Sequence, residues 1–365
     1  MSELVLGLDV GGTSSRAIAT TLDGEIVGRG DAGGGNPLAV PPDLAAAEVA
    51  RALHGALAGT DPARIAAAVL GLAGVSGFDQ PETAAAFQRV WNAAGLRCPV
   101  RAVGDAQVAF ASGTDEPLGT VLIAGTGAAA ARIDGDRITR VGDGLGWLLG
   151  DRGSGFWIGR KAAADTALRL QAGLPPTLLT ELVARAVLDA DGIENATPAT
   201  EARQCNSSTR PEPAPTGPAA EAVGSGSSAS TALADASRTA GATGDDLSER
   251  ASASDSFVIA VHRRPPRSLD RLAPIVTEAA LAGDALAAAI LDEAAAHLAA
   301  AVAAVREPHE RTPIVLSGSV LRGAAPVRDS VRVRLAAAWP DAPVTEAGPA
   351  ELGAAKLAAL SLRSP

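Results

Sequence analysis

The sequence has few of the residues that form cross-links or metal centres. It contains two cysteines, Cys98 and Cys205, which lie far apart and form no CxxC pair, and its four histidines show no paired metal-ligand spacing. Neither a disulfide framework nor a zinc or iron–sulfur site is therefore indicated.

Aromatic residues and positive charge are also scarce. The 365 residues include no Tyr, four Trp and five Phe, and the net charge is −10. Nucleic acid and anionic membranes are bound by basic surfaces, so we expect neither as a partner. The N-terminus has no pattern of a secretory leader, and no apolar run looks long enough to cross a bilayer, which predicts a cytoplasmic protein.

The opening stretch is the most informative part of the chain. An apolar run from Leu4 ends at Asp9 and continues through Gly11, Gly12 and Thr13. This pattern predicts a buried strand that leads into a glycine turn, whose consecutive amides can hold phosphate groups. A carboxylate beside bound phosphates commonly serves Mg²⁺. A plain hairpin, in which the glycines only make the turn, fits this stretch alone equally well.

The same pattern returns later in the chain. Residues 4–28 and 120–142 both read as strand, glycine turn, strand, Asp-Gly hairpin and strand, and the second turn is Gly125-Thr126-Gly127. The repeat predicts two similar domains that hold a nucleotide between them. The second turn also fits a GxGxxA dinucleotide fingerprint, but that motif requires a helix next, so an oxidoreductase is disfavoured.

Strands and helices alternate along the rest of the chain. This order predicts an α/β protein with mixed sheets flanked by helices. We expect domains at 1–112 and 113–365, with a final helix at 349–362 that packs back on the first domain. Residues 30–37 are expected to form a flexible loop. Residues 189–256 are rich in Ser, Thr, Ala, Gly and Pro, which predicts a largely disordered surface insertion.

Five motifs in this order resemble the actin-like sugar-kinase superfamily: Asp9-Val-Gly-Gly-Thr13, Gly104-Asp105-Ala106, Gly125-Thr-Gly127, Gly146-Trp147 with Asp151-Arg-Gly-Ser154, and Ser317-Gly-Ser319. Within it, the chain is most similar to the family that joins N-acetylglucosamine and glucosamine kinases with the ATPase activators of benzoyl-CoA reductase. The resemblance implies two actin-like (ribonuclease H-like) domains, an active-site cleft between them, ATP and Mg²⁺ as cofactors, and a homodimer. The activators hold an iron–sulfur cluster through cysteines, which two isolated cysteines do not provide.

The resemblance also assigns roles to residues. Asp105 would be the catalytic base, although Gly104 stands where the family commonly has Asn, and Asp9 would reach Mg²⁺ through water. The ATP-binding residues would be Asp9, Gly11, Gly12, Thr13, Gly125, Thr126, Gly127, Gly318 and Ser319. The sugar-binding residues would be Asn36, Ser76, Gly77, Asp105, Trp147 and Asp151.

The predicted reaction is ATP-dependent phosphorylation of the 6-hydroxyl of an amino sugar. Asp31, Asp79 and Asp151 fall in the candidate sugar loops, and few aromatic residues are present to line an acetamide recess. Both features favour glucosamine over N-acetylglucosamine, which is the alternative substrate. A nucleotide-binding regulator and an ATPase that drives a partner protein are further alternatives. Regulators of this fold usually carry a helix-turn-helix segment before the first strand, and here the fold begins at residue 4.

Overall fold

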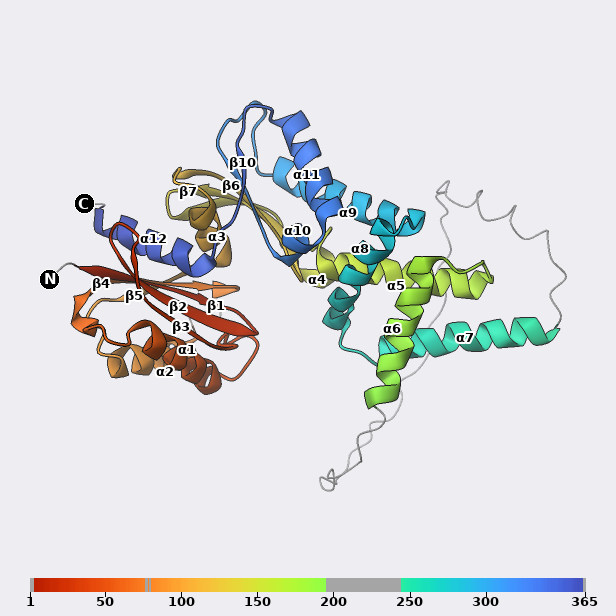
Figure 1. Ribbon diagram of the computed structural model, residues 1–365, viewed down its shortest axis with the longest axis horizontal. Coiled ribbons are helices and arrows are strands. Elements are labelled where there is room, and N and C mark those ends of the chain that lie inside the picture. Colours follow the sequence, from red (N-terminus) through yellow and green to blue (C-terminus); the bar gives the residue numbers. More distant parts are fainter. Residues whose placement is uncertain (1–2, 76–77, 79, 195–243, 364–365) are drawn as a thin grey trace, which may run out of the picture.

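The computed structural model describes residues 3–75, 78, 80–194 and 244–363, which form two α/β halves (Figure 1). The first half contains a five-stranded sheet in the order β3-β2-β1-β4-β5, and the second a five-stranded sheet in the order β10-β9-β6-β7-β8. The strands are β1 Leu4–Val10, β2 Ser14–Thr21, β3 Ile26–Gly33, β4 Ile65–Leu72, β5 Val100–Gly104, β6 Leu118–Ala124, β7 Ala128–Asp134, β8 Arg137–Asp143, β9 Ile314–Ser317 and β10 Val344–Glu346.

The two sheets have the same topology. In each sheet, three antiparallel strands are followed by two strands that run parallel to the first one. The sequence repeat predicted three matching strands in each half, and the structure shows that all five strands of the two sheets match in order and direction. The expected fold class, two mixed sheets flanked by helices, is confirmed.

Helices cover both faces of the first sheet. Helix α1 packs on β2 and β3, whereas α12 at the end of the chain packs on β1 and β4 from the other side (Figure 1). The helices are α1 Pro42–Ala56, α2 Pro81–Ala93, α3 Asp105–Gly113, α4 Gly146–Leu149, α5 Gly155–Ala172, α6 Leu178–Glu194, α7 Gly244–His262, α8 Ala273–Leu281, α9 Ala285–Ala303, α10 Ser319–Gly323, α11 Ala325–Ala338 and α12 Ala350–Arg363, with short 3₁₀ segments η1 Pro62–Arg64 and η4 Pro266–Leu272.

The alternation of side chains along β1 determines where Asp9 points. Leu4, Leu6, Leu8 and Val10 belong to the core beneath α1 and α2, while Val5 packs with the side chains of α12. Gly7 lies on the α12 side too, where an added Cβ would overlap the carbonyl oxygen of Glu351. Because side chains two residues apart share a face of a strand, Asp9 also points toward the start of α12.

The carboxyl ends of the parallel strands carry the predicted motifs. Strands β1, β4 and β5 run in the same direction, so Asp9, Ala73 and Asp105 lie at one edge of the first sheet. Strands β6 and β9 are parallel in the second sheet, and the segments beginning at Gly125 and Gly318 follow them. This is the edge at which open α/β sheets usually bind ligands.

The predicted loop over residues 30–37 is partly wrong, because β3 continues to Gly33. The glycines have another role here: a Cβ at Gly28 or Gly30 would overlap the backbone carbonyls of Ala56 and Ala52 in α1. Helix α1 therefore packs directly on the backbone of β3, and glycine in this strand permits that close approach.

The predicted insertion over 189–256 is wrong at its two edges. Helix α6 reaches Glu194, and α7 begins at Gly244 and includes the segment 257–261. Residues 195–243 lie outside the described residues. The helical edges follow from packing, because α6 and α7 contact α5 and each other.

The expectation that no apolar run is long enough to cross a bilayer is also wrong. Helix α9, Ala285–Ala303, is sufficiently long and apolar by length and composition alone. It packs against α8 and α11, and its residues Ile290, Leu291 and Leu298 are buried in the hydrophobic core of the second half. Packing inside the protein thus accounts for its apolar face, as in the core helix of a globular domain.

Candidate functional site

A cavity of about 570 Å³, here called the acidic cleft, lies between the two halves. Its lining residues are Asp9, Arg16, Asp105, Val108, Ala109, Ile123, Ser317, Arg322, Ala347, Gly348, Pro349, Ala350 and Glu351. The first sheet supplies Asp9 and Arg16, and the second half supplies Ile123, Ser317 and Arg322. The structure therefore brings Asp9 and Asp105 into one cavity.

Asp105 stands at the start of α3, directly after β5. Its Oδ1 accepts a hydrogen bond of 2.9 Å from the N–H of Ala106, and the Gln107 side chain accepts one of 2.8 Å from the N–H of Gly104. The carboxylate is accessible from the cleft but crowded by protein atoms, and this desolvation raises its pKa above the ordinary value. A raised pKa suits a group that must accept a proton near neutral pH.

Asp9 lies in a mixed field of charges. Desolvation and the charge of Glu351 raise its pKa to about 6, and the charge of Arg16 acts in the opposite direction. Arg16 Nη1 is 3.9 Å from Asp9 Oδ2, across the β1–β2 pair in which the two residues are partners. The cleft thus places a carboxylate that is difficult to ionise beside cationic side chains.

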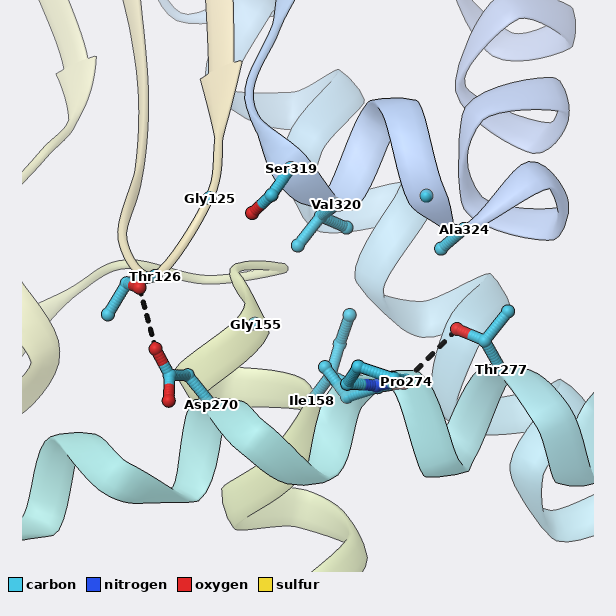
Figure 2. A pocket seen from close by; sticks show the side chains of 12 residues that line it. Gly125, Thr126, Gly155, Ile158, Asp270, Pro274, Thr277, Ser319, Val320 and Ala324 are labelled. Atoms are coloured by element: carbon cyan, nitrogen blue, oxygen red, sulfur yellow. Dashed lines mark hydrogen bonds between the residues drawn. The ribbon is translucent and has the colours of Figure 1, made fainter. Parts of the chain in front are cut away.

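A second, smaller cavity of about 180 Å³, here called the nucleoside cavity, lies in the second half. Figure 2 shows Gly125, Thr126 and Ser319 above it and Asp270 and Pro274 below. Its other lining residues are Gly155, Ile158, Ala273, Thr277, Val320, Gly323 and Ala324. Apolar walls with a few polar groups at the rim are typical of a site for a flat organic group such as a nucleobase.

The glycine turn after β6 is fixed by backbone hydrogen bonds. The Gly125 N–H donates to the Gly127 carbonyl at 2.9 Å, and the Gly155 N–H at the start of α5 donates to the Gly125 carbonyl at 2.7 Å. Asp151 supports the turn from behind, since its Oδ1 accepts a hydrogen bond of 3.2 Å from the N–H of Ala128. Asp151 itself is held at φ 55° by its N–H, which donates to Asp143 Oδ1 at 2.7 Å.

The glycine turn after β1 is joined to the loop that follows β3. The Gly35 and Asn36 N–H groups both donate to the Gly11 carbonyl at 3.2 Å. The Asn36 side chain is buried; it donates to the Ala73 carbonyl at 3.1 Å and accepts a hydrogen bond of 2.9 Å from the Leu38 N–H. Asn36 therefore connects the first turn to the segment after β4.

The remaining predicted residues are distributed unevenly. Gly318 lies beside the nucleoside cavity at φ 105°, and a Cβ there would overlap the backbone of Ala124.

Trp147 lies on α4, is 38% exposed, and meets Phe156 edge to face with ring centroids 5.7 Å apart. Asn36, Trp147 and Asp151 are absent from the linings of both cavities. Ser76, Gly77 and Asp79 lie outside the described residues, so the sugar contacts stay predictions.

Four charged residues of these cavities were not found by sequence reasoning: Arg16, Asp270, Arg322 and Glu351. Asp270 comes from η4 and has no local signature. Glu351 did carry a signal, because it is a lone carboxylate between Pro349 and the apolar final helix. Such a residue in the first turn of a buried helix requires an explanation, because charged side chains are rarely buried unless paired.

The carboxylates of the acidic cleft fit a magnesium ion that is held jointly with phosphates. Among the described residues, no group of three or more His, Cys, Asp or Glu side chains is arranged to hold a metal ion without other ligands. Mg²⁺ in nucleotide sites commonly takes one or two carboxylates, and phosphates and water supply the other oxygens. Asp9 is an oxygen donor of the required kind.

Two sheets of the same topology, each with a glycine turn directly after its first strand, define the actin-like fold class. Residues 6–208, more than half of the chain, match the BadF/BadG/BcrA/BcrD ATPase family. The chain belongs to this family. ATP is accordingly the nucleotide expected for the site.

Several known proteins are similar to this chain. An N-acetyl-D-glucosamine kinase of Dictyostelium discoideum is 28% identical over 190 residues, which is 50% of this chain and 59% of that protein. An N-acetylmuramic acid/N-acetylglucosamine kinase of Clostridium acetobutylicum is 34% identical over 90 residues, 24% of this chain and 29% of that protein. These matches span less than two thirds of either relative.

A solved structure is similar to this chain over almost its whole length. It is the crystal structure of a provisionally named N-acetylglucosamine kinase from Chromobacterium violaceum, which matches with a TM-score of 0.64 at 21% identity. The match covers 98% of this chain and 99% of that chain, and it supports the fold.

Proposed function

We propose that the protein is an ATP-dependent kinase that phosphorylates the 6-hydroxyl of an amino sugar. The observation that carries this proposal is the shared cavity of Asp9 and Asp105, which is lined by residues of both halves. Such a transfer uses one carboxylate near the metal-bound nucleotide and a second one near the acceptor hydroxyl. Asp9 would take the first role and Asp105 the second.

The nucleotide would extend from the nucleoside cavity toward the acidic cleft. Thr126 and Ser319 line the former, and Ile123 and Ser317 line the latter at the ends of the same two strands. The amides of the glycine turns would hold phosphate oxygens. Mg²⁺, when bound near Asp9, supplies charge that the transferred phosphoryl group needs.

Asp105 would accept the proton of the sugar hydroxyl as that oxygen forms a bond to the γ-phosphorus of ATP, while the bond from this phosphorus to the β–γ bridging oxygen breaks and ADP leaves. Phosphoryl transfer has a loose transition state, so the protein mainly positions the reactants and neutralises charge. Arg16 and Arg322 line the same cleft and would contribute positive charge. Closure of the two halves would exclude water, which otherwise would hydrolyse ATP.

Both partial sequence relatives are named as kinases of N-acetylglucosamine or N-acetylmuramic acid, and we favour the acetylated sugar for this reason. The glucosamine prediction depended on the scarcity of aromatic residues and on three carboxylates, of which Asp79 lies outside the described residues. Asp31 lies on β3 with a 78% exposed side chain near Arg16, and Asp151 contacts the second glycine turn. Glucosamine thus remains the second candidate, with less support from the geometry.

Steady-state kinetics with N-acetylglucosamine, glucosamine and glucose would test the proposal. We expect the highest kcat/KM for N-acetylglucosamine and measurable sugar-dependent ADP release. A higher value for glucosamine would restore the second candidate. ATP hydrolysis that no sugar stimulates would instead favour an ATPase that acts on a partner protein.

We also propose that residues 1–112 and 113–365 are the two domains. Helix α12 then belongs to the second domain by sequence and packs on the first sheet. This arrangement would couple nucleotide binding in one half to the position of the other. A homodimer remains a proposal that size measurement in solution would test.

A further inference from the structure

Glu351 is a buried carboxylate that the proposed chemistry has not yet used. It is 8% exposed, lines the acidic cleft, and its Oε2 has no hydrogen-bond partner among the described residues. A carboxylate oxygen without a partner costs free energy when it is removed from water. Such an arrangement persists where a ligand supplies the missing interaction.

The surrounding backbone does not supply a partner. Glu351 lies in the first turn of α12, where free N–H groups could have bound it, but the N–H groups of Leu352 and Gly353 donate to the Pro349 carbonyl at 3.1 and 3.3 Å. Within the described part of the chain, neither arginine of the cleft forms an ion pair with Glu351, whereas Arg16 pairs with Asp9 and Asp31 at 3.9 Å.

The geometry of β1 brings Glu351 toward Asp9. Helix α12 approaches β1 so closely at Gly7 that only a residue without a side chain fits beneath the Glu351 carbonyl. Asp9 is two residues further along the same face of the strand. In agreement with this proximity, the charge of Glu351 contributes, after desolvation, to the raised pKa of Asp9.

Two like charges in one cleft repel each other, and a divalent cation between them would remove the repulsion. We propose that Glu351 and Asp9 together hold the divalent cation of the nucleotide, directly or through its water molecules. This inference rests on the proposed function, since it assigns a second protein ligand to the metal–nucleotide site. Two carboxylates plus phosphate oxygens match the preference of Mg²⁺.

A cation bound by both Asp9 and Glu351 would also connect two segments that are far apart in the sequence. Helix α12 follows β10 of the second sheet and packs on β1 of the first. A cation held by Asp9 and Glu351 would therefore connect the end of the chain to its first strand, at the place where the two halves meet.

The test uses Mn²⁺ as the probe and the full-length protein. Free Mn²⁺ is followed by electron paramagnetic resonance during titration in the presence of ADP, for wild type, Glu351→Gln and Glu346→Gln. Glu346→Gln is the matched control, because Glu346 lies five residues earlier in the chain, is exposed, and pairs with Arg332 at 2.9 Å outside the cleft. ADP affinity without metal is measured by calorimetry for each protein.

We expect Glu351→Gln to weaken Mn²⁺ binding in the ADP complex by about 10- to 100-fold, the range typical of groups that support a metal site. ADP affinity without metal should remain unchanged, and Glu346→Gln should behave as wild type. Equal Mn²⁺ affinity in Glu351→Gln and wild type would overturn the inference.

Loss of metal-free ADP binding in Glu351→Gln would also overturn it, since Glu351 would then support the structure of the cleft and not the metal. If wild-type protein binds neither ADP nor Mn²⁺ with ADP, the proposed function fails instead. The two failures are therefore distinguishable.

Discussion

The hydroxyl of Thr126 donates a hydrogen bond of 2.6 Å to Oδ2 of Asp270, a residue 144 positions later in the chain. This bond joins the second glycine turn to η4 and crosses the rim of the nucleoside cavity (Figure 2). The turn is thus held from two sides, by α5 through backbone bonds and by Asp270 through a side chain.

Asp270→Ala should weaken ADP binding by about tenfold or more, because the glycine turn loses a hydrogen bond to a charged group, which is worth about 1.5 kcal/mol or more. Calorimetry measures the change. Asp292→Ala is the matched control, since Asp292 is an exposed carboxylate that pairs with Arg334 away from the cavity. In a double-mutant cycle, Thr126→Ala should have little further effect once Asp270 is absent. Additive losses would show that the two residues act separately.

Asp105→Asn should lower kcat by about 10²- to 10⁴-fold, because the amide cannot accept the proton of the sugar hydroxyl. The affinity for ADP and the KM for the sugar should change little, since the amide is similar in size and polarity. Asp115→Asn is the control, as its side chain is 98% exposed and pairs with Lys356. Full turnover in the Asp105 variant would remove this residue from the proposed role.

Sequence patterns were sufficient for the parts of this fold that depend on local order. The run from Leu4 to Asp9 predicts a strand followed by a turn, and its recurrence at 120–127 predicts the second half. The position of Asp105 after a short apolar strand was also readable from the sequence, whereas its catalytic role came from the resemblance to the sugar-kinase family. Each of these inferences needs only neighbours in the sequence and the rule that parallel strands end at one edge.

Long-range packing determined what the sequence did not reveal. The glycines of β3 suggest a loop in the sequence, but in the structure they allow α1 to pack directly on the strand backbone. Nothing in the sequence near Asp270 indicates its contact with Thr126. The role of Glu351 depends on how closely α12 approaches β1. Such distances arise from the tertiary structure and have no local signal in the chain.

Stability without metal should depend on pH through Asp9. Its pKa rises from 3.8 to about 6 on folding, so the folded state binds the proton more tightly than the unfolded state. The associated stability is fully present below pH 3.8 and is lost as the pH rises to about 6. The free energy of unfolding should fall over this interval by up to about 3 kcal/mol.

Urea denaturation in EDTA at several pH values tests this dependence. Asp9→Asn should lack this contribution, whereas Asp31→Asn should retain it, because Asp31 also lies near Arg16 but has a 78% exposed side chain. An identical pH dependence in wild type and Asp9→Asn would contradict the assignment.

Gly7→Ala should destabilise the protein by about 3 kcal/mol, as is typical of overpacking in a closely packed interior. The new Cβ would overlap the Glu351 carbonyl and the Ala355 N–H, so α12 must move away from β1. Urea denaturation measures the loss. Gly323→Ala is the control, because a Cβ at this position in α10 meets no atom within 4 Å. It should be neutral or stabilise the protein by up to about 1 kcal/mol, since alanine favours a helix.

Gly7→Ala should also weaken Mn²⁺ binding in the ADP complex, because Glu351 would move with α12. Unchanged stability and unchanged Mn²⁺ affinity in this variant would show that α12 is not held where the structure has it.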